Sequence, residues 1–178
     1  MSVRYVAFLR GINLGKRRAT KEQLAEAFEG LGFERVKTLI ASGNVVFSAE
    51  KTDEAALTEQ IEDGLQAALG FTVDTMLRTS AIVDELIDSE PFAGIDVTKQ
   101  TRRYVTLLAA KTASSLHLPH EVMDGALRIL SRTDREVFSV LDLGKSGGTV
   151  DAMRIIEQEY GKAATTRNWN TILKLRGL

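Results

Sequence analysis

Residues 34–48 read ERVKTLIASGNVVFS, and this stretch decides the fold of the first half of the chain. Two short runs rich in β-branched residues, Glu34 to Ile40 and Asn44 to Ser48, flank Ala41-Ser42-Gly43. The glycine and the asparagine at this junction accept the positive φ angles that a tight turn requires. The stretch therefore predicts a β-hairpin.

The segments on either side of the hairpin predict one strand and one helix each. They are a strand from Val3 to Arg10, a helix capped by Thr20 that ends before Gly32, a helix capped by Asp53 that ends at Gly70, and a strand from Phe71 to Arg78. The resulting order, β-α-β-β-α-β, is typical of the ferredoxin-like arrangement, in which both helices cover one face of a four-stranded antiparallel sheet.

The second half of the chain predicts a similar order of elements. We expect a short helix capped by Ser80 that ends before Pro91, strands at Arg103–Ala110, Ala126–Ser131 and Glu136–Leu143, a short helix or loop within Ser114–Gly125, a helix from Thr149 to Tyr160, and a last helix capped by Thr166. The sequence thus predicts an α+β protein. A ferredoxin-like subdomain spans residues 1–79, a helix and connection span 80–101, and a second βαββα-type subdomain with a C-terminal helix spans 102–178.

Composition excludes several kinds of chemistry. The chain has no cysteine, so thiolate catalysis, iron–sulfur clusters, cysteine-ligated zinc and disulfides are ruled out. The first residues lack the apolar core of a signal peptide, and no apolar run approaches the roughly 18 residues of a membrane span. We therefore expect a cytoplasmic protein without a membrane partner.

Charge is distributed unevenly along the chain. Residues 1–49 hold 8 basic and 4 acidic residues, residues 50–96 hold 2 and 12, and residues 97–178 hold 13 and 8. A protein that coats nucleic acid should be basic throughout, so the acidic middle disfavours that function and leaves room for a local basic face.

The predicted topology brings polar residues of two loops to one edge of the first sheet. The first two strands are expected to be parallel with the third between them, which places their carboxyl ends roughly 10 Å apart. The glycine-containing loop after the first strand, the basic residues 16–18 and the start of the following helix suit a phosphate or carboxylate. A solvated loop whose glycines serve only the turn is the alternative. The candidate binding residues at this edge are Arg10, Asn13, Lys16, Ser42, Gly43 and Asn44.

Two other motifs support no catalytic or metal site. The stretch Gly144 to Gly148 resembles part of a phosphate-binding loop, but Ser139 stands where the nucleotide-hydrolase motif requires glycine. His117 and His120 lack a third ligand at a suitable spacing. We expect no metal and no cofactor, and the sequence nominates no catalytic residue.

Three pieces of sequence resemble a bacterial family known as domain of unknown function 1697: FLRGIN at residues 8–13, ASGNVVF at 41–47 and TTRNWNT at 165–171. The resemblance implies two small subdomains that contain helices and strands, and it carries no substrate, cofactor or catalytic residue. Lys16 stands where the family often has a second glycine. Within the third piece, Arg167, Asn168 and Asn170 join the candidate binding residues. The alternative for that piece is a capped helix whose tryptophan packs.

Three hypotheses of function follow. The leading one is a cytoplasmic protein that binds a small anionic ligand at the loop edge of the N-terminal sheet. The second is a nucleic-acid-binding module, although the Asn44–Ser48 strand lacks the aromatic series of the common RNA-binding sheet. The third is a transferase or hydrolase that acts on a phosphorylated metabolite. The sequence leaves open whether the protein is an enzyme and which oligomeric state it adopts.

Overall fold

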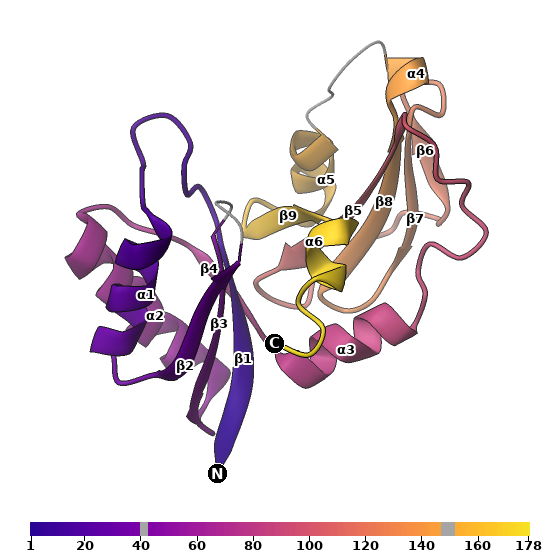
Figure 1. Cartoon of the computed structure of the whole chain (residues 1–178). Coiled ribbons are helices and arrows are strands. Elements are labelled where there is room, and N and C mark those ends of the chain that lie inside the picture. The colour runs from indigo at the N-terminus through magenta and orange to yellow at the C-terminus, as the bar shows by residue number, and fades with distance from the viewer. Residues whose placement is uncertain (40–42, 147–151) are drawn as a thin grey trace. The chain divides into compact units, whose positions relative to one another are not determined.

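A computed structural model describes residues 1–39, 43–146 and 152–178 of the chain. The predicted α+β class is confirmed: over these residues the chain forms two antiparallel sheets and six helices. The chain divides into two compact units (Figure 1). The first consists of Met1–Asp84 with Leu175–Leu178, and the second consists of Glu85–Lys174.

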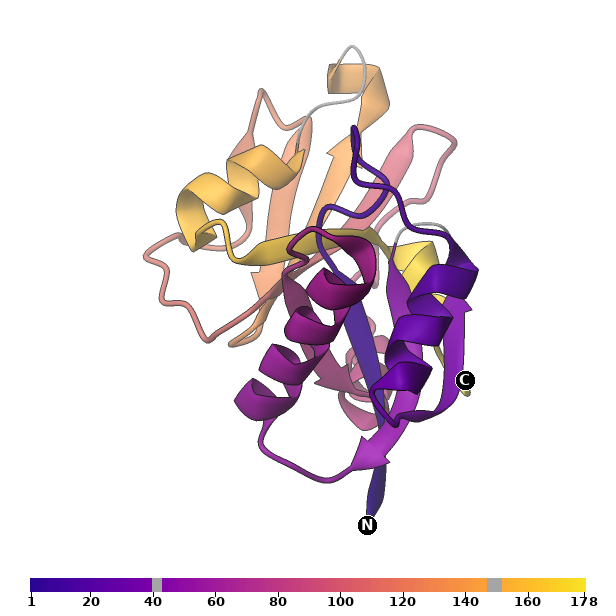
Figure 2. The same ribbon diagram turned by 90° about the vertical axis from the view of Figure 1, so that its left-hand side faces the viewer.

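The first unit is a four-stranded sheet with two helices on one face. Its elements are β1 (Ser2–Leu9), α1 (Lys21–Gly30), β2 (Glu34–Leu39), β3 (Asn44–Glu50), α2 (Glu54–Leu69) and β4 (Thr75–Thr79), and α3 (Ser80–Asp88) follows. The strand order is β2-β3-β1-β4, so β3 lies between β1 and β2 as expected. Figure 2 shows α1 and α2 side by side on the same face of this sheet. The carboxyl ends of β1 and β2 therefore point to one edge.

Local sequence signals explain where these helices begin and end. The Thr20 hydroxyl accepts a hydrogen bond from the Gln23 backbone N–H, and the Gln23 side chain accepts one from the Thr20 N–H, which together form the predicted capping box. Asp53 caps α2 through the Ala56 N–H, and Gly70 ends it with a φ of 79°. The predicted cap of α3 is wrong by one residue, because the Ile82 N–H donates to the hydroxyl of Thr79 instead of that of Ser80.

The core of the first unit lies between the sheet and the two helices. Alternate residues of the central strands face the helices, and α1 and α2 each contribute an apolar stripe. The buried set includes Tyr5, Ala7, Leu9, Leu24, Phe28, Val45, Phe47, Leu57, Ile61 and Leu65. β4 is shorter than predicted, because Phe71 and Val73 pack against this core from the loop that precedes it.

The second unit is a five-stranded sheet of order β6-β7-β8-β5-β9. Its elements are β5 (Thr101–Leu108), β6 (His120–Val122), β7 (Leu127–Arg132), β8 (Glu136–Asp142), α4 (Leu143–Ser146), α5 (Ala152–Tyr160), β9 (Ala164–Asn168) and α6 (Trp169–Leu173). The segment between Ser114 and Gly125 contains β6 and no helix. The predicted helix start at Thr149 lies outside the described residues.

The predicted cap of the last helix is wrong. Thr166 lies in β9, opposite Thr106 of β5, and the two hydroxyls are 2.8 Å apart. The cap of α6 is Asn168, whose side-chain oxygen accepts from the Asn170 N–H. A strand therefore stands where the sequence predicted only a helix, because pairing with β5 satisfies the backbone of this β-branched segment.

Trp169 packs in the second unit, as the alternative interpretation of the TTRNWNT stretch expected. Its side chain is 4% exposed. Its ring centroid lies 5.2 Å from that of Phe92 and 6.0 Å from that of Phe138, both in edge-to-face geometry.

Across the described parts of the chain, no helix combines the length and the apolar character that crossing a lipid bilayer demands.

Candidate functional site

The loop after β1 and the turn of the β2–β3 hairpin meet at one edge of the first sheet. The Leu9 N–H donates to the Gly43 carbonyl at 2.8 Å. A Cβ atom on Gly43 would lie 3.0 Å from the Leu9 Cβ and 3.3 Å from the Ile12 Cβ, and Gly43 has a φ of +75°. The two loops therefore lie side by side at the same edge of the first sheet, as the topology predicted. We call this place the loop edge. Ser42 lies outside the described residues.

The loop after β1 is closed by its own hydrogen bonds. Asn13 has a φ of 61°, its side-chain oxygen accepts from the Ala19 N–H at 3.2 Å, and its carbonyl accepts from the Arg18 guanidinium. The Arg17 N–H donates to the Leu14 carbonyl at 3.0 Å. Asn13 therefore holds the loop in shape.

Cationic side chains cover this loop. Lys16, Arg17 and Arg18 are exposed, and Arg10 is partly buried. The Arg17 guanidinium lies over the Phe71 ring, 5.9 Å from its centroid. Residues 10–18 contain these four cations and no acidic residue. At the start of α1, the capping box occupies the N–H groups of Thr20 and Gln23, so these two groups are not donors for a ligand.

Asn44 is enclosed in the hairpin. It is 1% exposed, and its side-chain amide donates to the Leu39 carbonyl at 3.1 Å. This bond connects the last residue of β2 with the first residue of β3. Asn44 therefore stabilises the turn that presents Gly43.

The candidates from the TTRNWNT stretch lie in the second unit, in β9 and α6. Burial lowers the pKa of Arg167 to about 10, so its guanidinium stays protonated at neutral pH. That guanidinium donates to the Thr165 hydroxyl at 2.7 Å and to the Thr166 carbonyl at 3.1 Å. The side-chain oxygen of Asn170 accepts from Arg103. With Asn168 at the cap of α6, these residues organise β9 and α6.

Next to the loop edge, Glu62 of α2 supports the start of β4. Its carboxylate accepts from the Thr75 N–H at 2.7 Å, and the adjacent Asp74 carbonyl accepts from the Arg10 N–H at 2.8 Å. Burial raises the pKa of Glu62, and the charges of Asp74 and Asp63 raise it further, against the lowering effect of the Thr75 hydrogen bond.

Glu62→Gln is expected to stabilise the protein at neutral pH and to have no effect in acid. Because the folded state raises the pKa of Glu62, ionisation costs stability, which falls as pH rises from the ordinary glutamate value through the raised value. Glutamine keeps an oxygen for the Thr75 N–H and cannot ionise. The melting temperature of the variant should exceed that of the wild-type chain by a few degrees at about pH 7, and the two should be equal at about pH 3. A difference that stays constant across this range would contradict the assignment.

Sequence reasoning missed a second group of cations in the first unit. A cavity of about 520 Å³ is lined by Arg4, Arg35, Val36, Lys37, Gly177 and Leu178. The available signal was the Arg-x-Lys spacing in the predicted β2 and the arginine near the start of the parallel β1. The β-bulge between Glu34 and Lys37, which positions Arg35, carries no signal in the sequence.

His117 and His120 lie in the second unit, in the segment between β5 and β7. Over residues 1–39, 43–146 and 152–178, no three histidine, aspartate or glutamate side chains gather as a metal-ligand set. His117 is exposed, and His120 lines a cavity of about 200 Å³ in the second unit together with apolar residues such as Leu116 and Ile129. Of the Gly144–Gly148 stretch, residues up to Ser146 belong to α4, and Gly147 and Gly148 lie outside the described residues.

Comparison with known proteins gives a family and a fold. The family model "Protein of unknown function (DUF1697)" matches residues 2–138. The conserved bacterial protein SP0830 from Streptococcus pneumoniae has a similar structure, with a TM-score of 0.74 and 18% identity over 98% of this chain and 97% of that one. No curated protein matches the chain. At this identity, the structural likeness shows the fold alone.

Proposed function

This chain belongs to the DUF1697 family of proteins of unknown function, and we propose that it binds a small anionic ligand, bearing a phosphate or a carboxylate, at the loop edge of the first sheet. The observation that carries the proposal is the contact of Gly43 with Leu9 and Ile12. This contact packs the loop of residues 10–18 against the hairpin, so the hairpin supports the loop that carries the cationic side chains.

The loop supplies complementary means of holding an anion. Lys16 offers an exposed, compact charge, and Arg18 offers a planar fork of donors that matches a phosphate or carboxylate. Gly11 and Asn13 have positive φ angles, which form the bend that carries these side chains. The asparagine bond that closes the loop limits the entropy lost on binding.

A thermal-shift screen of phosphorylated metabolites, carboxylates, nucleotides and short RNAs tests the proposal. A ligand at about one hundred times its Kd stabilises a protein by about 2.7 kcal/mol. We expect a small phosphate or carboxylate to raise the melting temperature of the wild-type chain. The double variant Lys16→Gln/Arg18→Gln should show a clearly smaller shift than the wild-type chain.

The control variant Lys51→Gln/Lys162→Gln removes the same charge from two exposed sites, one after β3 at the opposite end of the first sheet and one in the second unit, and should keep the shift. If no small anion raises the melting temperature, or if the Lys16/Arg18 variant responds like the control, the proposal fails. If only short RNAs raise the melting temperature, and their affinity falls steeply as salt is added, a nucleic-acid-binding function replaces the proposed one.

A further inference from the structure

We propose a second anion-binding site in the first unit, in which Arg4, Arg35 and Lys37 bind a phosphate group, either as free phosphate or in a phosphate monoester. The site is separate from the loop edge. Arg4 lies six residues before Arg10 along the sequence, which corresponds to roughly 20 Å along an extended strand. It lies toward the opposite end of the same sheet.

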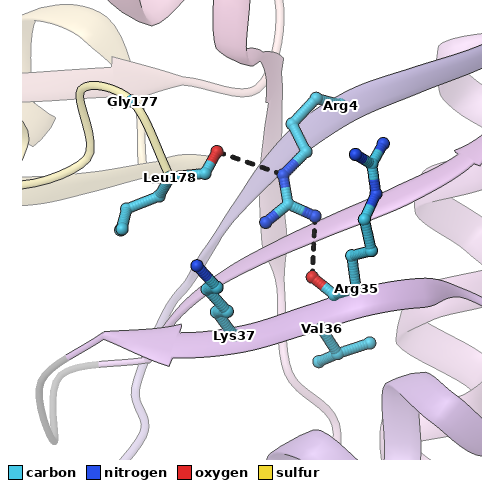
Figure 3. A pocket seen from close by; sticks show the side chains of 6 residues that line it. All are labelled: Arg4, Arg35, Val36, Lys37, Gly177 and Leu178. Atoms are coloured by element: carbon cyan, nitrogen blue, oxygen red, sulfur yellow. Dashed lines mark hydrogen bonds between the residues drawn. The ribbon is translucent and has the colours of Figure 1, made fainter.

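The three cations converge from two strands. Figure 3 shows the side chains of Arg4, Arg35 and Lys37 on one side of β2, whereas Val36 points to the other. A β-bulge produces this arrangement: Arg35, with a φ of 50°, and Val36 together occupy the space opposite Phe47. Val36 packs against the core, so the cationic side chains on either side of it share the face that bears the cavity.

Hydrogen bonds hold both guanidinium groups in place. Arg4 donates to the Leu178 oxygen at 3.2 Å and to the Arg35 carbonyl at 2.7 Å. Both arginines also donate to the Ser48 hydroxyl, Arg4 at 3.3 Å and Arg35 at 3.1 Å. The terminal nitrogens of Arg35 and the Nζ of Lys37 make no hydrogen bond within the described parts of the chain. These donors are available to a ligand.

The positive charge of this cluster is not balanced by acidic side chains. Within the described ranges, no aspartate or glutamate side chain forms an ion pair with Arg4, Arg35 or Lys37. Burial, and secondarily the charge of Arg35, lower the pKa of Arg4. Two guanidinium groups bonded to one hydroxyl repel each other, and a bound dianion would relieve that repulsion.

The cavity fits a small phosphorylated molecule better than a bare ion. Its volume of about 520 Å³ lies within the usual range of ligand pockets. Val36 and Leu178 add apolar surface beside the cations. A phosphate would pair with the guanidinium groups and Lys37, and an organic group attached to it would contact these apolar residues.

Calorimetric titration of the Lys16→Gln/Arg18→Gln chain isolates this site from the loop edge. We expect one inorganic phosphate or phenyl phosphate to bind per chain, with phenyl phosphate the tighter. Adding Arg35→Gln and Lys37→Gln should raise the Kd at least about tenfold, because charge-assisted hydrogen bonds are lost. Both side chains are exposed, and Lys37→Gln alone serves if the combined variant does not fold.

The control adds Lys51→Gln and Lys162→Gln to the same background and should leave the Kd unchanged. Equal affinity for both probes identifies free phosphate as the ligand, and tighter binding of phenyl phosphate identifies a monoester. The proposal is overturned if neither probe binds, if sodium chloride of matched ionic strength gives the same heat, or if the Arg35/Lys37 substitutions change the Kd no more than the control. Failure of the loop edge appears separately, as identical anion binding by wild type and the Lys16/Arg18 variant.

Discussion

Phe47→Ala is expected to lower the free energy of unfolding of the first unit by about 3–5 kcal/mol, the usual cost of removing a buried phenyl ring. Phe47 is 0% exposed and lies in β3 beneath the two helices. Its ring centroid is 4.6 Å from that of Phe33 and 5.1 Å from that of Phe28. It also stacks on Tyr5 at 5.6 Å. Truncation would leave a cavity bordered by three aromatic rings, which cannot collapse without moving a helix or a strand.

Urea unfolding followed by far-UV circular dichroism, together with hydrogen exchange of the β1 and β3 amides, measures this loss. Tryptophan fluorescence is unsuitable, because the single tryptophan, Trp169, lies in the second unit. Phe71→Ala is the matched control. Phe71 is only partly buried at the edge of the same core, so its substitution should cost clearly less. Equal losses for the two variants would show that Phe47 is not the centre of the core.

Gly43→Ala is expected to lower the free energy of unfolding by about 2–5 kcal/mol, more than the same change at Gly32. Both glycines have positive φ angles, +75° at Gly43 and +83° at Gly32, so both substitutions incur backbone strain of about 1–2 kcal/mol. Only at Gly43 does the new methyl group meet other atoms, at 3.0 Å from Leu9 and 3.3 Å from Ile12. Overpacking of this kind adds about 1–3 kcal/mol.

The difference between the two glycine variants therefore measures the contact between the loops. Equilibrium unfolding in urea gives both free energies. The same Gly43 substitution should also weaken anion binding at the loop edge, because it pushes the loop after β1 away from the hairpin. If the two variants lose the same stability, the contact of Gly43 with Leu9 and Ile12 does not form in solution.

Sequence reasoning succeeded where the signals are local. The Thr20–Gln23 capping box, the Asp53 cap and the glycine at the end of α2 lie within a few residues of the feature that they specify. The hairpin and the parallel directions of β1 and β2 followed from the order of elements, and together they predicted that the two loops lie at one edge of the sheet. The direct contact of Gly43 with Leu9 and Ile12 is closer than the roughly 10 Å expected from strand spacing.

Sequence reasoning failed where the deciding partner is distant. β9 depends on β5, in which Thr106 faces Thr166 across 60 positions of sequence. The TTRN segment also resembles a helix start, so only the tertiary pairing decides between the two structures. The cationic cavity around Arg4 and Arg35 depends in the same way on a bulge, and no residue type signals that bulge.

The measurement that tests the anion-binding account most directly is a titration of the ¹⁵N-labelled chain with inorganic phosphate, followed through its backbone amide resonances. Saturable shifts are predicted at the loop edge, over residues 10–18 and at Gly43, at phosphate concentrations where matched sodium chloride has no effect. Phosphate that leaves these amides unmoved, or moves them no more than sodium chloride does, would contradict the account.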